Sequence, residues 1–152
     1  MVSKRSFERH SGLQAAITRD FITHFTSTKI KLIYLENGAA QTLVFEKETF
    51  LDIGVTLIDF RGLPDVILLD SDKNVLFLVQ AVTFGFPTPI SFDRHNTLEE
   101  LFKNCTANRV YVNAFPDFLT YKRFAQAIGW GTKVWIAETP EHIIHYNGNT
   151  AR

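Results

Sequence analysis

The apolar positions between Leu63 and Thr83 form two short runs that a polar turn separates. The first run follows a Pro-Asp pair, the turn spans Ser71 to Asn74, and the second run covers Val75 to Val82. Both runs are too short and too rich in β-branched residues for helices, so the pattern predicts two strands paired as a hairpin. The second run is apolar on both faces, which is typical of a strand buried in the middle of a sheet.

The chain before this hairpin predicts a helix, a second hairpin and a short helix. Ser11 and Gln14 have the spacing of a capping box, so the first helix is expected to begin at Ser11 and to end near Thr26. The hairpin turns at Asn37-Gly38, and Gly54 suits the position after the short helix. The ranges expected are a strand at 30–35, a strand at 41–45, a helix at 46–53 and a short strand at 55–59.

After Thr83 the pattern alternates between helices and strands. The stretch from Phe84 to Pro89 is too rich in glycine and proline for regular structure, and such a loop after a central strand often lines a site. A capping box at Thr97 predicts a helix that reaches Asn104. A strand at 109–115, a helix at 117–128 with Phe118 on its inward face, and strands at 133–138 and 142–146 follow. This order predicts an α/β (α+β) fold, a mixed β-sheet flanked by helices.

Length and composition indicate one domain that spans residues 1–152, with residues 1–10 as a frayed start or one added by cloning. The hydrophobic content of 45% and the charged content of 21% are ordinary for a globular protein. No apolar run approaches the ~20 residues of a membrane span. The single cysteine, Cys105, excludes an internal disulfide and a zinc site made of cysteines, and it fits the cytoplasm.

The formal net charge is zero, but the charges are unevenly distributed along the chain. Residues 1–34 contain six lysines and arginines against two acids, residues 35–72 contain two against eight, and residues 73–152 contain eight against six. An acidic middle between basic flanks suits a metal-binding face beside a polyanion-binding one. Charge alone favours the alternative, a solvated surface with uneven charge.

Asp65 and Gln80 are the main candidates for chemistry, because they stand at neighbouring ends of the two predicted central strands. A metal site for phosphodiester hydrolysis needs hard oxygen ligands on rigid adjacent strands, often an aspartate, a second acid and a lysine two residues later. Here these positions hold Asp65, Gln80 and Val82, so the second charge and the lysine are missing. The alternative is that Asp65 only begins a strand and Gln80 only bonds within the sheet.

The other polar candidates are weaker. Arg94 and His95 follow the rigid loop and precede a predicted helix. From that position they could contact a phosphate, or they could be solvated residues at the start of the helix. Lys122-Arg123 lies on the outward face of a predicted helix, which favours a solvated role. Asp70 and Asp72 flank the turn and are expected to make local hydrogen bonds. Two further histidines, at 142 and 145, would point to opposite faces of a strand and make no metal pair.

From Asn37 onward the chain resembles the C-terminal catalytic domain of the BsuBI/PstI family of type II restriction endonucleases. The resemblance rests on GLPDVILLDSDKNVLFLVQAVT and on ANRVYVNAFPDFLTYKRFAQAIGWGTKVWIAETPEHIIHYNG. The family shows a similar LPDVVLYD-like strand, an EAVT-like segment, a V-x-V-x-AFPD-like stretch and an H-I-I-H-x-N-G-like end. These segments occur in the same order over about three-quarters of the chain.

The resemblance implies the restriction-endonuclease-like PD-(D/E)XK fold and hydrolysis of double-stranded DNA with Mg²⁺. It implies that Asp65, Gln80 and the carbonyl of Ala81 bind the metal, with Gln80 where the family has glutamate. Asp93 stands where a basic residue is expected. We therefore expect slow or absent cleavage by this chain, with Arg94 as the catalytic cation and Asp20 as an accessory acid. Gln80 is either natural or an engineered replacement.

The resemblance also implies DNA contacts, with Arg94, His95, Lys122 and Arg123 as the candidates. Family enzymes carry an N-terminal half that helps to bind DNA, so such a domain is expected to be missing here. Cutting both strands usually calls for two-fold symmetry, and a homodimer in a restriction–modification system is expected. The alternative is a catalytically inactive nuclease fold that binds DNA or another protein.

Overall fold

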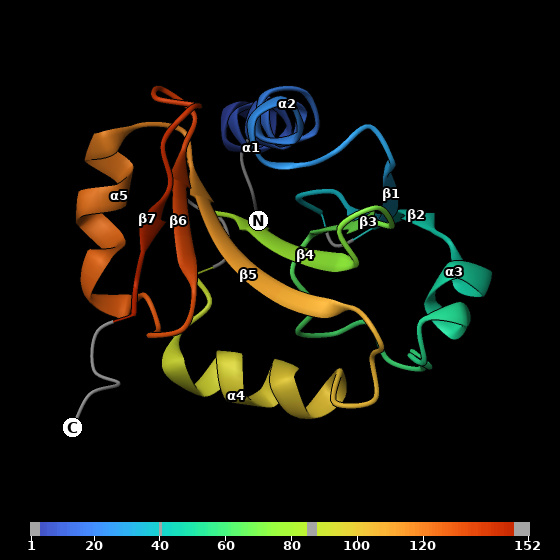
Figure 1. Ribbon diagram of the computed structural model, residues 1–152. Coiled ribbons are helices and arrows are strands. Elements are labelled where there is room, and N and C mark those ends of the chain that lie inside the picture. The colour runs from blue at the N-terminus through green and yellow to red at the C-terminus, as the bar shows by residue number, and fades with distance from the viewer. Residues whose placement is uncertain (1–3, 40, 85–87, 148–152) are drawn as a thin grey trace.

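The computed structural model describes residues 4–39, 41–84 and 88–147. Within them one seven-stranded mixed sheet forms, in the order β2-β1-β3-β4-β5-β6-β7 (Figure 1). The strands pair antiparallel except for β4 with β5 and β5 with β6, which are parallel. The bounds are β1 Ile30–Glu36, β2 Thr42–Phe45, β3 Val66–Asp70, β4 Val75–Ala81, β5 Asn108–Phe115, β6 Lys133–Ile136 and β7 Ile144–His145. The expected mixed sheet flanked by helices is confirmed.

Helices cover both faces of the sheet. Alternate strand residues point to opposite sides, and apolar residues on both sides need a packing partner. One face packs against α1 (Lys4–Ala16), a π-helical turn (Ile17–Phe21) and α2 (Ile22–Phe25). The other face packs against α3 (Lys47–Asp52) and α4 (Phe92–Leu101). Helix α5 (Phe118–Phe124) and a 3₁₀ turn (Ala125–Ala127) lie against the end of β5 and β6, as Figure 1 shows at the left.

The predicted hairpin forms the centre of the sheet. β3 and β4 pair antiparallel from Val66 with Val79 to Asp70 with Val75. β4 is the fourth of the seven strands, and Leu76 to Ala81 are all buried, which confirms the interpretation of its two apolar faces. The turn prediction for Asp70 is also confirmed, because its carboxylate accepts bonds from the backbone N–H groups of Asp72 and Lys73.

The start of the chain differs from the expectation. The first helix already runs from Lys4, so residues 4–10 are not a frayed start, and Ser11 lies inside the helix rather than at its cap. Gly12 in a helix interior costs about 1 kcal/mol relative to alanine, which is why the sequence favours a break there. Packing overrides this local preference, since His10 and Leu13 on either side of Gly12 are buried. Residues 1–3 lie outside the described range.

Three other local predictions were wrong. No strand forms at 55–59, where the chain makes only turns and extended backbone before Gly62. Helix α4 begins after Ser91, whose hydroxyl accepts a bond from the Arg94 amide, and Thr97 is an interior residue that bonds the carbonyl of Asp93. Phe118 was expected to face inward but is half exposed. The predicted cap at Thr97 was a weaker signal than the packing of Leu98 and Phe102 beneath the sheet.

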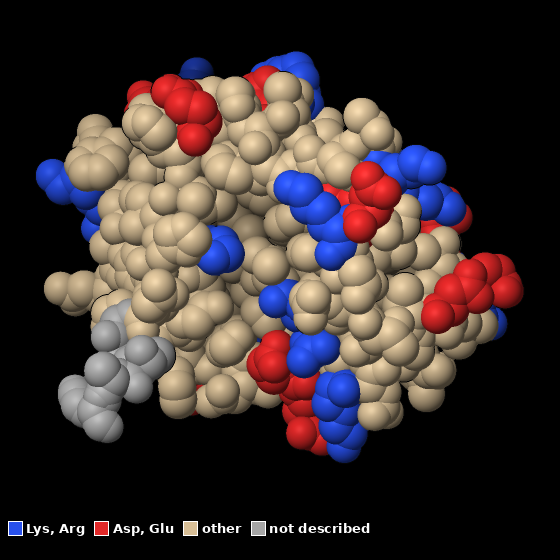
Figure 2. Space-filling view, viewed as in Figure 1, with Lys and Arg blue, Asp and Glu red and all other residues tan. Residues whose placement is uncertain are grey.

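Two broader observations concern the surface charge and the hydropathy of the helices. Figure 2 shows lysine and arginine interspersed with acids on the visible face, so the uneven charge of the chain segments does not become one single-signed field there. In the described residues no helix is long and apolar enough to cross a membrane.

Candidate functional site

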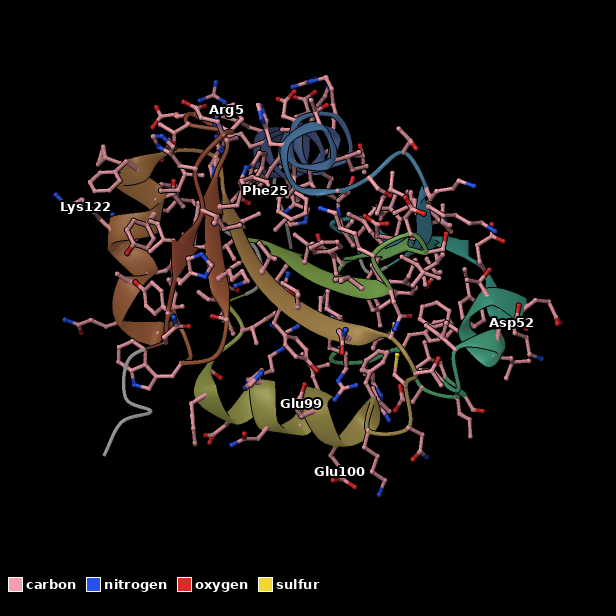
Figure 3. All side chains as sticks on the ribbon, viewed as in Figure 1. Arg5, Phe25, Asp52, Glu99, Glu100 and Lys122 are labelled. Atoms are coloured by element: carbon pink, nitrogen blue, oxygen red, sulfur yellow. The ribbon has the colours of Figure 1, made fainter. Side chains whose placement is uncertain are left out.

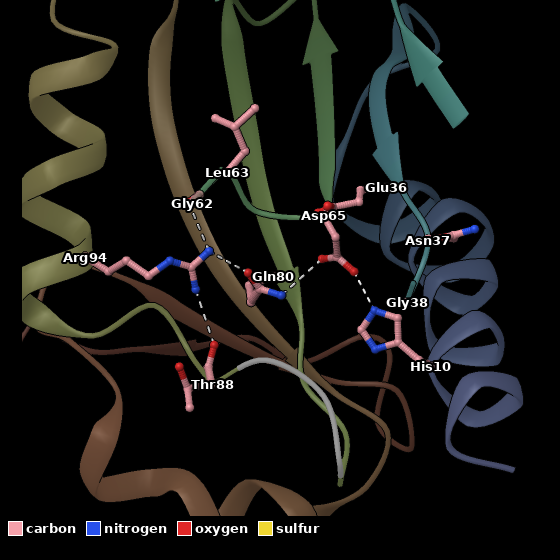
Figure 4. Close-up of a pocket in the computed structure, with 10 residues that line it drawn as sticks. All are labelled: His10, Glu36, Asn37, Gly38, Gly62, Leu63, Asp65, Gln80, Thr88 and Arg94. Atoms are coloured by element: carbon pink, nitrogen blue, oxygen red, sulfur yellow. Dashed lines mark hydrogen bonds and ion pairs between the residues drawn. The ribbon is translucent and has the colours of Figure 1, made fainter. Parts of the chain in front are cut away.

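A polar cavity of about 380 Å³ opens at the end of β3 and β4 where Asp65 and Gln80 lie (Figure 4). Asp65 precedes β3 directly, and its side chain is 4% exposed. Gln80 is the next-to-last residue of β4 and is 1% exposed. The cavity residues are His10, Glu36, Asn37, Gly38, Gly62, Leu63, Asp65, Gln80, Thr88 and Arg94. The structure therefore brings together three of the predicted site residues, Asp65, Gln80 and Arg94.

Asp65 accepts four hydrogen bonds, which saturate the usual capacity of a carboxylate. Its Oδ1 accepts from the Ala81 backbone N–H at 2.8 Å and from Gln80 Nε2 at 3.4 Å. Its Oδ2 lies 2.7 Å from His10 Nε2 and 2.7 Å from Gln14 Nε2. Four donors offset the cost of burying this carboxylate and fix its orientation.

The orientation of the Gln80 amide follows from its neighbours on both sides. Arg94 has only donors, and its Nη2 lies 2.7 Å from Gln80, so the atom that faces it is the oxygen Oε1. The nitrogen Nε2 then faces two acceptors, Asp65 Oδ1 at 3.4 Å and the carbonyl oxygen of Ala81 at 3.3 Å. A donor group thus occupies the space between two hard oxygens.

Arg94 extends from the first turn of α4 into the cavity, and Figure 4 shows its guanidinium beside Gln80. Besides Gln80 it donates to the backbone carbonyls of Gly62 and Thr88. Burial lowers the pKa of Arg94, while the nearby charges of Asp65 and Glu36 raise it. Because an arginine side chain stays protonated over the whole accessible pH range, the group remains a cation at neutral pH.

Glu36, at the end of β1, is a second acid of the cavity that sequence reasoning missed. Its backbone N–H bonds the carbonyl of Asp65, so the two residues stand side by side on neighbouring strands. Burial and the charge of Asp65 raise the pKa of Glu36. The position just before the Asn37-Gly38 turn was the available signal, because that turn brings β1 to the same sheet edge as Asp65.

His10 and Gln14 were missed for a different reason. They lie four residues apart on α1 and both contact Asp65. His10 falls in the stretch that was expected to be a frayed start, and Gln14 was interpreted only as a helix-capping residue. The spacing of two polar residues at i and i+4 beside buried Leu13 was the signal that could have identified them. His10 is 1% exposed and Gln14 7%.

The remaining predicted residues lie away from the cavity lining. Asp20 pairs with its neighbour Arg19 at 3.0 Å on the π-helical turn. The ring of His95 packs edge-on against Tyr111, with centroids 4.6 Å apart. Lys122 projects from α5, as Figure 3 shows, and Arg123 lies 4.7 Å from the ring centroid of Phe84. These four residues lie at other places in the structure and do not contact Asp65 or Gln80.

The described residues of the predicted loop after β4 lie at two different places on the surface. Thr88 lines the cavity, and Thr83 lies 3.4 Å from His10. Phe84 lines a second, more apolar groove of about 640 Å³ between α1 and the start of α5. Residues 85–87 lie outside the described range, so the prediction of a rigid loop is not tested there.

The oxygens around Gln80 suit a hard divalent cation, which prefers carboxylate and carbonyl ligands. Asp65 Oδ1 and the Ala81 carbonyl already flank one point, and that point holds the Gln80 amide nitrogen. Across the described ranges no group of three or more His, Cys, Asp or Glu side chains is placed to hold a metal ion. The residues present therefore fit an ion held by few protein ligands.

Comparison with known proteins gives one consistent family. The BsuBI/PstI restriction endonuclease domain matches residues 3–149. The type II restriction enzyme BsuBI of Bacillus subtilis is 34% identical over 139 residues, which cover 91% of this chain and 43% of that enzyme. The type II restriction enzyme AplI of Arthrospira platensis is 31% identical over 141 residues, with 88% of this chain and 42% of that enzyme covered.

A solved structure is similar as well. The SdaI restriction endonuclease superposes with a TM-score of 0.84 and 30% sequence identity, covering 92% of this chain and 43% of that chain. The chain therefore spans less than half the length of the relatives it matches.

Proposed function

The chain belongs to the BsuBI/PstI restriction endonuclease domain family, and from that premise we propose that it hydrolyses DNA phosphodiester bonds with Mg²⁺, at a rate that Gln80 lowers. It is a type II restriction endonuclease-like domain, as the expected family and fold are both confirmed. The substrate, the metal and the residue roles are the content of the proposal. One observation carries it: a buried corner of oxygens at which a single amide nitrogen takes the place of a cation.

Three groups would hold the metal: the Asp65 carboxylate, the Ala81 carbonyl and the Gln80 side chain. When bound, Mg²⁺ would polarise a phosphate and lower the pKa of a water molecule that attacks it. Asp65 is prepared for this role because it is buried and four donors fix the orientation of its carboxylate. Glu36 adds a second negative charge to the same cavity.

Arg94 supplies the positive charge that phosphoryl transfer requires, because the transition state gathers negative charge on the phosphate oxygens. Val82 occupies the position where a lysine is usual, and it is fully buried in an apolar cluster with Phe115 and Val134. Arg94 is the cation that lines the cavity together with Asp65. Its bonds to the Gly62 and Thr88 carbonyls hold the guanidinium at the cavity wall.

Gln80 weakens this site through its orientation as well as its lack of charge. Arg94 selects the amide oxygen, and the nitrogen is left to face Asp65 and Ala81. Turning the amide would offer an oxygen to a metal but would place N–H groups against the guanidinium. A glutamate could present one oxygen to Arg94 and the other to a metal at once. Gln80→Glu is therefore expected to repair the corner without moving Arg94.

The test is cleavage of plasmid DNA in Mg²⁺ and in Mn²⁺ by the chain, by Gln80→Glu and by Gln80→Glu with Asp65→Asn. Gln80→Glu should raise cleavage about fivefold or more, because a unit charge beside a cation contributes on the order of 1–4 kcal/mol at close range. Asp65→Asn should return cleavage to background. Cleavage that does not depend on Asp65 would contradict the site assignment.

A second candidate is a catalytically inactive nuclease fold that binds DNA or a protein. The observation in its favour is the same Arg94–Gln80 bond, since it holds the amide oxygen away from the place a metal would take. Salt-dependent DNA binding without metal-dependent cleavage, unchanged by Gln80→Glu, would support this function over the first.

DNA contacts outside the cavity and the assembly of the protein belong to the proposal too. Lys122 and Arg123 are exposed cations on α5, and Arg123 reaches the loop after β4 through Phe84. They suit phosphate contacts, whereas the ring of His95, on α4, packs against Tyr111 and has less freedom to do so. We propose a homodimer on double-stranded DNA, because two active sites are needed to cut both strands.

A further inference from the structure

Two side chains of α1 hold the oxygen of Asp65 that faces away from Gln80. His10 Nε2 and Gln14 Nε2 each lie 2.7 Å from Asp65 Oδ2. They come from 55 and 51 residues earlier in the chain, and one helical turn separates them. Figure 4 shows His10 reaching Asp65 from the helix side of the cavity.

We propose that His10 and Gln14 are positioning residues for metal binding, and that they fix the Asp65 carboxylate so that Oδ1 faces the metal. This inference rests on the proposed function of the site. Metal-binding carboxylates are commonly oriented by such outer hydrogen bonds, and the loss of one typically costs 10–100-fold in metal affinity or activity.

The geometry explains why this pair can set the direction of the carboxylate. The two donors use both acceptor positions of Oδ2, so that oxygen has no capacity left for a metal. Oδ1 is the atom that faces the Ala81 N–H and Gln80 Nε2, and its bond to Gln80 is the longest of the four at 3.4 Å. A metal that displaces this weak contact meets a carboxylate already held in place on its other side.

The same two residues connect the segments that surround the cavity. Gln14 Nε2 donates to the backbone carbonyl of Glu36 at 2.7 Å as well as to Asp65. With Nε2–H directed at Asp65, the Nδ1 of His10 can accept a hydrogen bond from the hydroxyl of Thr83, which lies 3.4 Å away. The pair therefore joins α1 to the end of β1, to Asp65 and to the loop after β4.

A local irregularity of the helix follows the pair directly. The π-helical turn begins at Ile17, and the Thr18 hydroxyl donates to the carbonyls of Gln14 and Ala15. Single π-turns within helices occur frequently at functional sites. Here the turn allows Ile17 and Phe21 to remain buried against the sheet while Gln14 faces Asp65.

The experiment measures Mn²⁺ affinity by calorimetry in the Gln80→Glu protein, without DNA. Gln14→Met keeps the length of the side chain and removes the donor, and His10→Leu removes the ring donor. Both should weaken Mn²⁺ binding about 10–100-fold. His10→Gln retains an N–H near the position of Nε2 and should restore most of the affinity. Glu8→Gln, an exposed change on the same helix, should bind as the parent does.

Thermal unfolding of each variant distinguishes a positioning role from a purely structural one. A positioning role requires that Mn²⁺ affinity is lost in a variant that remains folded at the assay temperature. If His10→Leu does not fold, Gln14→Met and His10→Gln decide the question. Unchanged or tighter Mn²⁺ binding by folded Gln14→Met would overturn the proposal, because the pair would then be neutral or a competitor. A Gln80→Glu parent that binds no Mn²⁺ would overturn the proposed function instead, and this inference with it.

Discussion

The two ends of strand β3 each carry a buried aspartate that accepts four hydrogen bonds, and the two ends have opposite characters. At one end Asp65 receives three side-chain donors and one backbone donor beside a polar cavity. At the other end Asp70 receives the backbone N–H groups of Ser27, Asp72 and Lys73 and one hydroxyl. A backbone N–H remains when its side chain is substituted and is held in place by the fold. A side-chain donor can rotate away or be lost by substitution.

The charges around the two aspartates differ in the same way. Asp65 shares its cavity with Glu36, Arg94 and His10, and the pKa of Glu36 is raised by burial and by Asp65. Burial alone would raise the pKa of Asp70, but the bonds from Ser27, Lys73 and Asp72 outweigh it and hold that pKa below its usual value. Asp70 therefore stabilises the fold, while Asp65 is surrounded by the charged and polar groups of the proposed site.

The largest effect is expected at the Asp65 end, from Arg94. In the Gln80→Glu protein, Arg94→Met should slow single-turnover DNA cleavage by about 10²–10³-fold, as the loss of one transition-state donor typically does. Lys103→Met removes an exposed cation that pairs with Glu100 and should leave the rate unchanged. Equal rates for the Arg94 and Lys103 variants would show that the guanidinium only holds the side chain at position 80.

The next effect compares the stability of the two ends directly. Asp70→Ala should lower the free energy of unfolding by about 3 kcal/mol, because buried donors that lose their acceptor cost roughly 1–3 kcal/mol each. Asp65→Ala should cost about 1 kcal/mol, because water in the adjoining cavity can replace the carboxylate. Urea unfolding of both variants measures the difference. A larger loss for Asp65→Ala would reverse the assignment of structural and functional ends.

The Asp70 end could be predicted from sequence, and the Asp65 end only in part. An aspartate at a four-residue turn has a local role that short-range geometry determines, and Asp70 fulfils it. The hairpin and the central place of β4 were predictable too, since a strand that is apolar on both faces has few alternatives. The pairing of Asp65 with Gln80 followed from the same hairpin.

Long-range partners could not be predicted from local patterns. His10 and Gln14 reach Asp65 across more than 50 residues, and Gly12 between them suggested a helix boundary instead of a helix interior. Arg94 was identified, but its bond to the Gln80 oxygen depends on where α4 begins, and Ser91 caps that helix six residues before the Thr97 that the sequence favoured. Tertiary packing decided both helix starts.

A smaller effect is expected from acid. A depressed folded-state pKa means that Asp70 contributes its full stabilisation above the unfolded-state value of about 3.8, and that this contribution is lost as pH falls through the folded-state pKa. The chain should therefore lose more stability between pH 5 and pH 2 than Asp70→Asn does, in urea unfolding series at matched ionic strength. Parallel pH curves for the two proteins would contradict a charge-dependent role for Asp70.

The smallest effect is expected on the helix that serves the Asp65 end. A Cβ at Gly12 would meet nothing within 4 Å, so alanine fits there without moving its neighbours. Gly12→Ala should raise the free energy of unfolding by about 0.5–1 kcal/mol, because alanine restricts the unfolded chain and favours the helix. Ala15→Gly, an exposed change on the same helix, should lower stability by a similar amount. Both variants can also be tested for Mn²⁺ binding in the Gln80→Glu protein. Tighter binding by Gly12→Ala and weaker binding by Ala15→Gly would show that the order of α1 limits how firmly Asp65 is held. Equal binding by both would restrict the influence of the helix to the two side chains that touch the carboxylate.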